Sequence, residues 1–161
     1  MEDLDLFLLA RQLVADLSDT AAAHGKSVRL KGEGTAPVRS NGNKLYRILQ
    51  NMLDNALKYS LDGTRVFVTL TLQDGFATVS VKNIASYEMN FTVEEITDQF
   101  VRGDPSRTGD GSGLGLAIAK SFSEQLGGVF RIDIDGDQFQ SSITFPLRTQ
   151  INTASTEQED S

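Results

Sequence analysis

The chain has 161 residues, of which 15 are Lys or Arg and 22 are Asp or Glu, giving a formal net charge of −7. This length suits one domain with a core of its own. The absence of cysteine excludes disulfides, a cysteine-ligated zinc and a cysteine nucleophile. The longest apolar run, Leu6 to Ala10, is far shorter than the ~20 residues that cross a bilayer, and no signal-type segment opens the chain. We therefore expect a soluble, cytosolic domain, and its acidity argues against non-specific nucleic-acid binding.

Two amphipathic helices are predicted in the first sixty residues. The first runs from Met1 to His24, where apolar residues recur at near-helical spacing before Gly25. A short strand at 28–30 and a glycine-rich connection at 32–37 follow. The second helix begins near the capping residue Asn41. Its core-facing stripe consists of Leu45, Ile48, Leu49, Met52, Leu53, Ala56 and Leu57.

The remaining elements are two hairpins and a third helix. Apolar residues alternate from Val66 to Leu72 and again from Ala77 to Val81, with Asp74-Gly75 as the turn. A second hairpin spans 130–145 around the turn at 135–137, and a helix at 114–126 lies between the two hairpins. This order predicts an α+β fold, a two-layer α/β sandwich in which helices cover one face of a mixed, mostly antiparallel sheet.

Two segments fall outside this regular pattern. The stretch 84–110 is far longer than an ordinary connection and carries only one weakly helical part, around 93–100. We interpret it as a lid. From Arg148 the sequence is almost free of apolar residues, so we expect a domain at 1–147 and a disordered tail at 148–161.

Four polar residues follow one side of the second helix: Arg47, Asn51, Asn55 and Lys58, with Tyr59 beside them. A solvated polar face is the ordinary explanation of such a row. However, asparagine is a mediocre helix former, so two of them in mid-helix are not the default surface choice. Their neutral carbonyl oxygens can complete the shell of a Mg²⁺ ion that already carries phosphate oxygens.

A glycine-rich turn, Gly111-Ser112-Gly113-Leu114-Gly115-Leu116, opens the third helix. Glycines let a ligand approach the backbone, and the unpaired N–H groups of a helix N-terminus bind phosphate oxygens without basic side chains. This explains how an acidic protein can hold a polyanion. The turn neither follows a strand nor ends in Gly-Lys-Ser/Thr, which disfavours a dinucleotide fingerprint and a Walker loop.

Three stretches resemble motifs of sensor histidine kinases. Residues 51–60, Asn-Met-Leu-Asp-Asn-Ala-Leu-Lys-Tyr-Ser, are similar to their N box, and residues 111–120 are similar to their G2 box. Residues 99–104, Gln-Phe-Val-Arg-Gly-Asp, resemble the F box between them. The chain from Leu4 to about Pro146 is thus identified as a member of the GHKL superfamily. The resemblance implies a Bergerat fold and the ATP-binding catalytic domain of a two-component histidine kinase.

The resemblance also implies roles for individual residues. Asn55 would ligate Mg²⁺, Asn51 would support the metal and the phosphates, and Lys58 would contact phosphate. Tyr59 and Phe100 would lie near the nucleotide, and Arg102 corresponds to the lid arginine that reaches the γ-phosphate. The turn residues Gly111, Ser112, Gly113, Leu114, Gly115 and Leu116 would cradle the phosphates and anchor the helix.

The sequence departs from the family at the third motif, Asp-x-Gly-x-Gly, where it has Asn83, Ala85 and Tyr87. The family's Asp accepts a hydrogen bond from the adenine amino group. Asn83 keeps an acceptor oxygen but loses the charge and adds an amino group. Loss of the two glycines predicts a stiffer strand exit and lower affinity.

The implied activity is transfer of the γ-phosphoryl group of Mg-ATP to a histidine. The implied partners are a separate dimerisation domain that carries this histidine and a response regulator, in a dimeric, membrane-tethered whole protein. His24 lies outside any phosphoacceptor motif, so a surface or capping role is expected for it. Two alternatives stay open: a serine kinase of the anti-sigma-factor type, which usually has Glu where Asn51 stands, and an interaction module that has lost its nucleotide.

Overall fold

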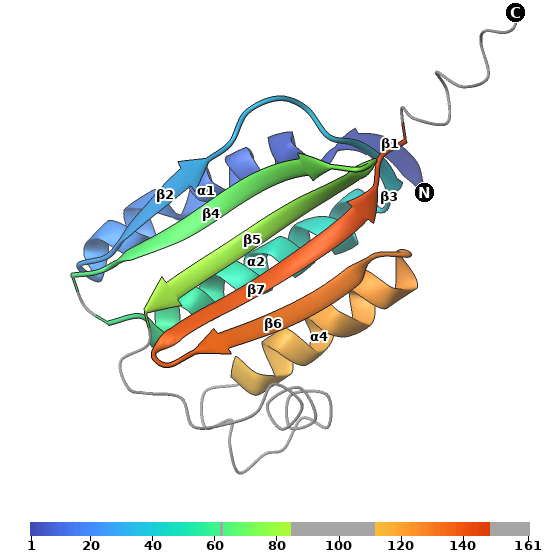
Figure 1. Cartoon of the computed structure of the whole chain (residues 1–161). Coiled ribbons are helices and arrows are strands. Elements are labelled where there is room, and N and C mark those ends of the chain that lie inside the picture. The colour runs from blue at the N-terminus through green and yellow to red at the C-terminus, as the bar shows by residue number, and fades with distance from the viewer. Residues whose placement is uncertain (62, 85–111, 149–161) are drawn as a thin grey trace, which may run out of the picture.

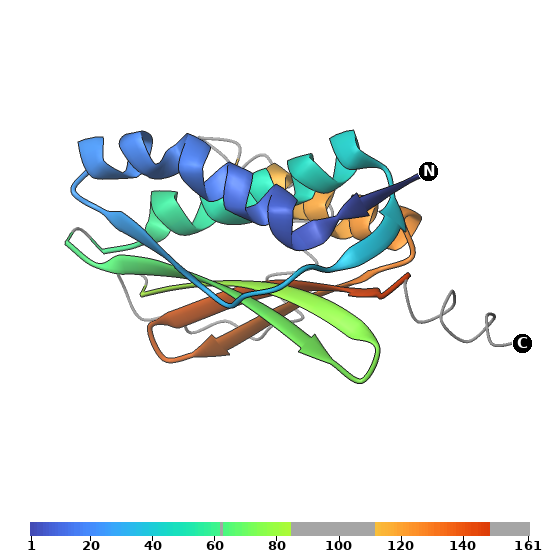
Figure 2. The same ribbon diagram turned by 90° about the horizontal axis from the view of Figure 1, so that it is seen from above.

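The computed structural model describes residues 1–61, 63–84 and 112–148. In this part of the chain a five-stranded sheet forms one layer and three helices form the other, all on the same face of the sheet (Figures 1 and 2). The helices are α1 (Leu6–Ala23), α2 (Gly42–Tyr59) and α4 (Ser112–Gln125). The strands, in spatial order, are β2 (Ser27–Lys31), β4 (Arg65–Gln73), β5 (Phe76–Ile84), β7 (Gln138–Pro146) and β6 (Val129–Asp135).

Only the edge strand β2 runs parallel to its neighbour, β4, and the other pairs are antiparallel. The turn between β4 and β5 places Asp74 and Gly75 at φ of 53° and 83°, the left-handed conformation that a tight hairpin requires. Both predicted hairpins and the predicted third helix are present. The α+β fold with helices on one face of a mixed, mostly antiparallel sheet is confirmed.

The prediction was wrong at the N-terminus, where Met1 to Asp5 was expected to be helical. Residues Glu2–Asp5 form strand β1, which pairs with β3 (Pro37–Ser40), and β3 begins at the last residue of the predicted connection 32–37. Asp5 ends the strand because its Oδ1 accepts hydrogen bonds from the main-chain N–H groups of Phe7 and Ala36, at 3.0 and 2.9 Å. One apolar residue of the predicted first helix, Leu8, is 51% exposed.

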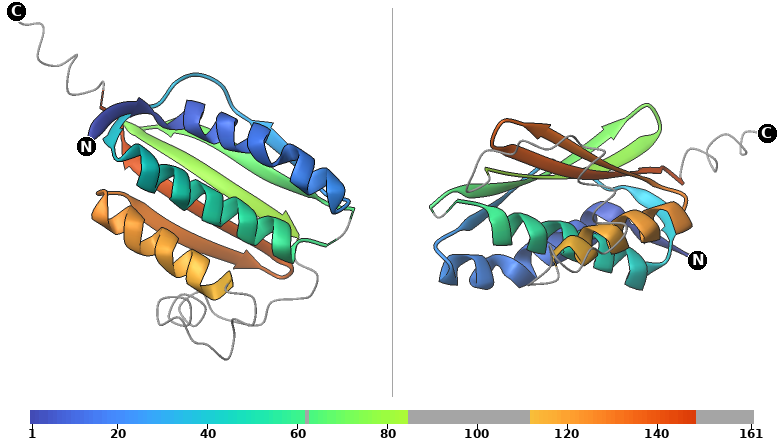
Figure 3. Two further views of the ribbon diagram at one scale, coloured as in Figure 1. Left: turned by 180° about the vertical axis from the view of Figure 1, so that it is seen from behind. Right: turned by 90° about the horizontal axis from the view of Figure 1, so that it is seen from below.

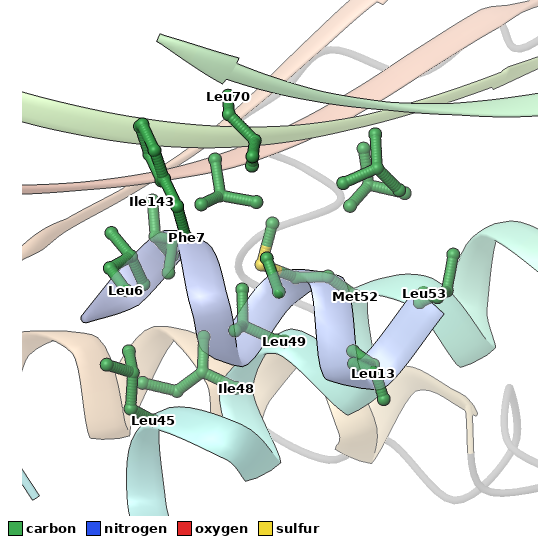
Figure 4. Close-up of a cluster of buried hydrophobic side chains, with 14 of the residues drawn as sticks. Leu6, Phe7, Leu13, Leu45, Ile48, Leu49, Met52, Leu53, Leu70 and Ile143 are labelled. Carbon is green, nitrogen blue, oxygen red and sulfur yellow. The ribbon is translucent and has the colours of Figure 1, made fainter. Parts of the chain in front are cut away.

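Helix α2 lies between α1 and α4 on the sheet (Figure 3). Its predicted apolar stripe is buried except for Leu57, which is partly buried, and packs against Phe7 of α1 and Ile143 of β7 (Figure 4). Polar contacts fix it on both sides. The Tyr46 hydroxyl donates to Asp16 on α1 at 2.8 Å, and Lys44 Nζ donates to Gln125 on α4 at 3.0 Å. The orientation of α2, and hence of its asparagines, is therefore set by three neighbours.

The close packing of α4 on the sheet gives a stability prediction. A Cβ atom added at Gly128 would lie 2.5 Å from the ring of Phe145, which is 1% exposed. Gly128→Ala should therefore lower the free energy of unfolding by about 1–3 kcal/mol, measured by urea denaturation. In the control Gly42→Ala, the new Cβ meets only the ends of two side chains, the carboxylate of Glu2 at 2.9 Å and Leu4 Cδ2 at 3.7 Å. Equal stability of the two variants would contradict the packing described here.

Candidate nucleotide-binding site

Three elements meet at one end of the molecule. Helix α2 and strand β5 both finish there, and α4, which runs in the opposite direction, begins there (Figures 1 and 3). The Leu61 N–H group, just after α2, donates to the Ile84 carbonyl oxygen at 2.9 Å. This hydrogen bond holds the last residue of β5 beside the end of α2. Residues from three separate parts of the sequence are thus gathered at one place.

The two asparagines of α2 face the start of α4. A Cβ atom built on Gly115 would lie 3.9 Å from Asn51 Cγ, in ordinary van der Waals contact, so the Asn51 side chain lies beside Gly115 of the glycine-rich turn. Asn55, one helical turn further on, is 9% exposed. Next to Gly115, Leu116 is 1% exposed and packs with Ile132 and Phe139 of the sheet. This contact holds the first turn of α4 in place.

Asn83 lies on the helix-facing side of the sheet, near the end of β5. Burial alternates along this strand, so Val79, Val81 and Asn83 point the same way, and Asn83 is 1% exposed. On β7 it lies opposite Phe139, next to the pair formed by Val81 and Ser141. Ser141, 2% exposed, was not predicted as a site residue. The signal was a serine within the otherwise apolar alternation of β7.

The three asparagines share buried side-chain atoms that make no hydrogen bond. Asn55 Oδ1, Asn51 Nδ2 and both amide atoms of Asn83 are buried without a hydrogen-bond partner in the described part of the chain. A buried polar atom left unpaired costs about 1–3 kcal/mol. A ligand could satisfy all four atoms if it offered a cation or donor to Asn55, an acceptor to Asn51, and both kinds of group to Asn83.

These donor atoms fit a magnesium nucleotide. Mg²⁺ is usually held by one or two protein oxygens and completes its shell with phosphate oxygens and water. Asn55 Oδ1 is a neutral oxygen of this kind. Among the described residues no group of three His, Cys, Asp or Glu side chains forms a metal cage, and such a shell does not need one.

Of the other predicted site residues, the structure describes only some. Lys58 is exposed and Tyr59, the last residue of α2, is half-buried. Phe100, Arg102, Gly111, Ala85 and Tyr87, and the proposed lid at 84–110 apart from Ile84, lie outside the described residues. Ser112, Gly113 and Leu114 form the first turn of α4, but their side chains are not described. The roles of these residues stay predictions.

Comparison with known proteins identifies the family. The sequence profile of the family described as "Histidine kinase-, DNA gyrase B-, and HSP90-like ATPase" matches residues 40–150. The chain belongs to this family. The histidine kinase-like ATPase fold accounts for the arrangement of α2, β5 and α4, and the resemblance to the ATP-binding catalytic domain of sensor histidine kinases is confirmed. Among the described residues, no helix is long and apolar enough to cross a membrane.

The relatives of this ATPase domain are sensor proteins of two-component signalling. The chain is 31% identical over 148 residues to the probable sensor protein PcoS of Escherichia coli, covering 91% of the chain and 30% of that protein. It is 32% identical to the sensor protein VanS of Enterococcus faecium, covering 78% of the chain and 33% of that protein. The chain thus spans about a third of each relative.

Solved structures agree with this assignment. The mycobacterial sensor histidine kinase MprB superposes with a TM-score of 0.74 at 27% identity, covering 91% of this chain and 97% of that one. The catalytic domain of histidine kinase ThkA, at 18% identity, shares the fold with a TM-score of 0.78 and covers 91% of this chain and 97% of that one.

A cleft of about 390 Å³ opens on the other side of the ATPase domain's helix α2, facing α1. It is lined by Thr20, Ala21, His24, Lys26, Asp54, Leu57 and Lys58. His24 caps α1, and its Nδ1 lies 2.9 Å from the Thr20 carbonyl oxygen, in line with the expected capping role. At the rim, partial burial raises the pKa of Asp54, an effect that the nearby Arg47 guanidinium reduces.

Asp54 gives a prediction for the pH dependence of stability. Because its pKa is higher in the folded than in the unfolded chain, ionisation of Asp54 opposes folding above its ordinary pKa of 3.8. Asp54→Asn should therefore raise the free energy of unfolding at pH 7. The gain should stay below about 1 kcal/mol, because Asp54 is only partly shielded from water, and should vanish as the pH falls below 3.8. Urea denaturation at pH 7 and pH 3 tests this, and a loss of stability at pH 7 would contradict it.

Proposed function

We propose that this chain binds Mg-ATP and donates the γ-phosphoryl group to a histidine on a separate domain, as one part of a two-component signalling protein. The observation that carries the proposal is the set of unpaired buried amides at Asn51, Asn55 and Asn83, next to the glycine-rich start of α4. Each amide has an unpaired donor or acceptor atom that can bind one part of a magnesium nucleotide: the metal, a phosphate or the base. Membership of the ATPase family and the sensor-protein relatives support the same assignment.

In this proposal each residue has a distinct role. Asn55 Oδ1 is a Mg²⁺ ligand, and Asn51 Nδ2 donates to a phosphate oxygen. When bound, the ion neutralises charge on the β- and γ-phosphates. The main-chain N–H groups of the α4 first turn hold the phosphates, including that of Gly115, which needs to be glycine for a close approach. Asn83 reads the base: its Oδ1 accepts from the adenine amino group and its Nδ2 donates to a ring nitrogen or a bridging water.

The residues at the periphery of the site keep the roles that the family resemblance implies. Lys58 contacts phosphate and Tyr59 and Phe100 lie near the nucleotide. Arg102 reaches the γ-phosphate. The lid at 84–110 closes over the bound nucleotide, and sequestering the phosphates from water is what such a lid contributes to phosphoryl transfer.

Phosphoryl transfer then needs little more than positioning and charge neutralisation. An imidazole nitrogen attacks the γ-phosphorus, the bond to the bridging β–γ oxygen breaks, and ADP leaves. Asn51 has an amide and cannot act as a general base at neutral pH, so hydrolysis by an activated water is disfavoured. The acceptor lies on a separate dimerisation domain. We further propose a dimeric, membrane-tethered whole protein with a response regulator downstream.

An autophosphorylation assay tests the proposal against its alternatives. With radioactive ATP and Mg²⁺, the isolated chain should bind nucleotide but incorporate almost no label, because His24, its only histidine, caps α1. Acid-stable label on Ser or Thr would instead identify an anti-sigma-factor-type serine kinase. No calorimetric binding of MgATP would identify an interaction module without nucleotide.

The metal role of Asn55 gives a mutational prediction. Asn55→Ala removes the proposed Mg²⁺ ligand, so MgATP affinity should fall at least tenfold, while binding of metal-free ATP changes little. Calorimetric titrations with Mg²⁺ and with EDTA separate the two contributions. Ser40→Ala is the matched control. Ser40 Oγ is another buried atom without a partner, but it precedes the far end of α2, roughly 20 Å away. Equal loss in both variants would refute the assignment.

The base-reading role of Asn83 gives a prediction with opposite effects on stability and binding. Asn83→Val removes two unpaired buried amide atoms and suits a strand, so the nucleotide-free protein should be as stable as wild type or up to about 2 kcal/mol more stable. ATP affinity should nevertheless fall about tenfold, and ATP and GTP should then bind alike. Thermal shifts with both nucleotides measure this. An unchanged preference for ATP over GTP would mean that Asn83 does not read the base.

A further inference from the structure

The face of the five-stranded sheet opposite the helices carries a concentrated positive charge. Figure 2 shows all three helices on one side, so the other side of the sheet is uncovered by any described element. Because β4 buries Val66, Val68 and Leu70 towards the helices, the residues between them point to this uncovered side. The same alternation on β2 and β5 assigns Arg29, Lys31 and Lys82 to it.

The strand register brings these charges together. Arg29 of β2 and Lys82 of β5 lie on either side of Phe67 of β4, in one row across three strands. Arg65 starts β4 beside Ser27, and Lys31 lies beside Thr69. These four cations, Arg29, Lys31, Arg65 and Lys82, therefore surround a half-buried phenylalanine. We call this group the basic corner.

The charge of the basic corner is not balanced locally. None of its four cations forms an ion pair with another described residue, whereas Arg39 and Arg148 both pair with Asp3. The acidic residues of the same face, Asp133 and Asp135, lie on β6 at the opposite edge of the sheet. In a chain of net charge −7, an unbalanced cationic cluster of this kind favours an acidic occupant.

The opposite end of the same face is apolar and lies next to the point where the described chain ends. Phe76 is 47% exposed and lies beside Pro146, and Val129, 56% exposed, lies beside Thr144, two residues before Pro146 on β7. The chain is fixed just beyond Pro146. Leu147 N–H donates to the Gly75 carbonyl oxygen at 2.9 Å, and Arg148 N–H donates to that of Pro37 at 2.7 Å. Whatever follows Arg148 therefore starts beside this apolar end.

We propose that the occupant of this face is the chain's own carboxyl-terminal segment, residues 149–161. Its sequence has one apolar residue near the start, Ile151, and three acidic residues near the end, Glu157, Glu159 and Asp160. This order matches the face, which is apolar beside Pro146 and basic at its other end. The segment is long enough. The six steps along β5 from Phe76 to Lys82 span about 20 Å, and nine extended residues reach about 30 Å.

Zero-length cross-linking of the full chain with a carbodiimide tests the proposal, because the reagent joins a carboxylate to a lysine only when the two touch. In the monomer, Glu157, Glu159 or Asp160 should be linked to Lys31 or Lys82. These links should disappear in 1 M salt, where the Debye length falls to about 3 Å. The ion pair between Lys120 and Glu124 provides a link that must form if the reagent works.

A charge variant that leaves both lysines intact separates specific docking from mere reactivity. Arg29→Gln/Arg65→Gln should reduce the tail links at least threefold, whereas the matched pair Arg11→Gln/Arg47→Gln on the helix layer should leave them unchanged. The proposal is overturned if the Lys120–Glu124 link forms without tail links to Lys31 or Lys82, or if the tail links equally to Lys44 and Lys120. Links between two chains only would assign the face to a second copy and overturn it as well.

Discussion

The arrangement of the candidate site depends on helix α2. Its apolar side is buried in the core, and two asparagines lie at the edge of that buried side. Its apolar stripe packs on the sheet, and Tyr46 and Lys44 hold it between α1 and α4. As a consequence Asn51 and Asn55 face the start of α4, and neither amide completes its hydrogen bonds within the described protein. The stability of the whole core is what keeps these unfavourable groups in place.

Unpaired buried amides are unusual, because most buried polar atoms find a partner. Among the described residues five buried side-chain atoms are unpaired, and four of them belong to the three asparagines that the family motifs single out. This distribution is what a binding site requires if its polar groups are preorganised for a ligand. In the proposed function, neutral amides, main-chain N–H groups and one cation would let a protein of net charge −7 hold a polyphosphate without a basic pocket.

Much of this arrangement could be predicted from the sequence because strong local signals agree with one another. The apolar period of α2, the Asp74-Gly75 turn and the glycine-rich start of α4 each follow directly from side-chain spacing or backbone freedom. The five-residue N-terminal region could not be predicted this way. Strand β1 exists because it pairs with β3, more than thirty residues away, and because Asp5 ends it by capping α1.

The site could be predicted only in part for a similar reason. The motifs name Asn51, Asn55 and Gly115, but only the fold shows that Asn51 rests on Gly115 and that Asn83 is fully buried on the same side of the sheet. The raised pKa of Asp54 arises from packing around the end of α1, which no local pattern contains.

The most direct test of the central claim follows the asparagine side-chain amide signals by NMR while Mg-ADP is added. If the three asparagines bind the nucleotide, the signals of Asn51, Asn55 and Asn83 should move together along one binding curve. Asn41, whose Oδ1 is already engaged by the Lys44 N–H group at 2.9 Å, should remain unchanged. Binding of Mg-ADP while the three signals stay in place, or an equal movement of the Asn41 signal, would contradict a nucleotide site at these asparagines.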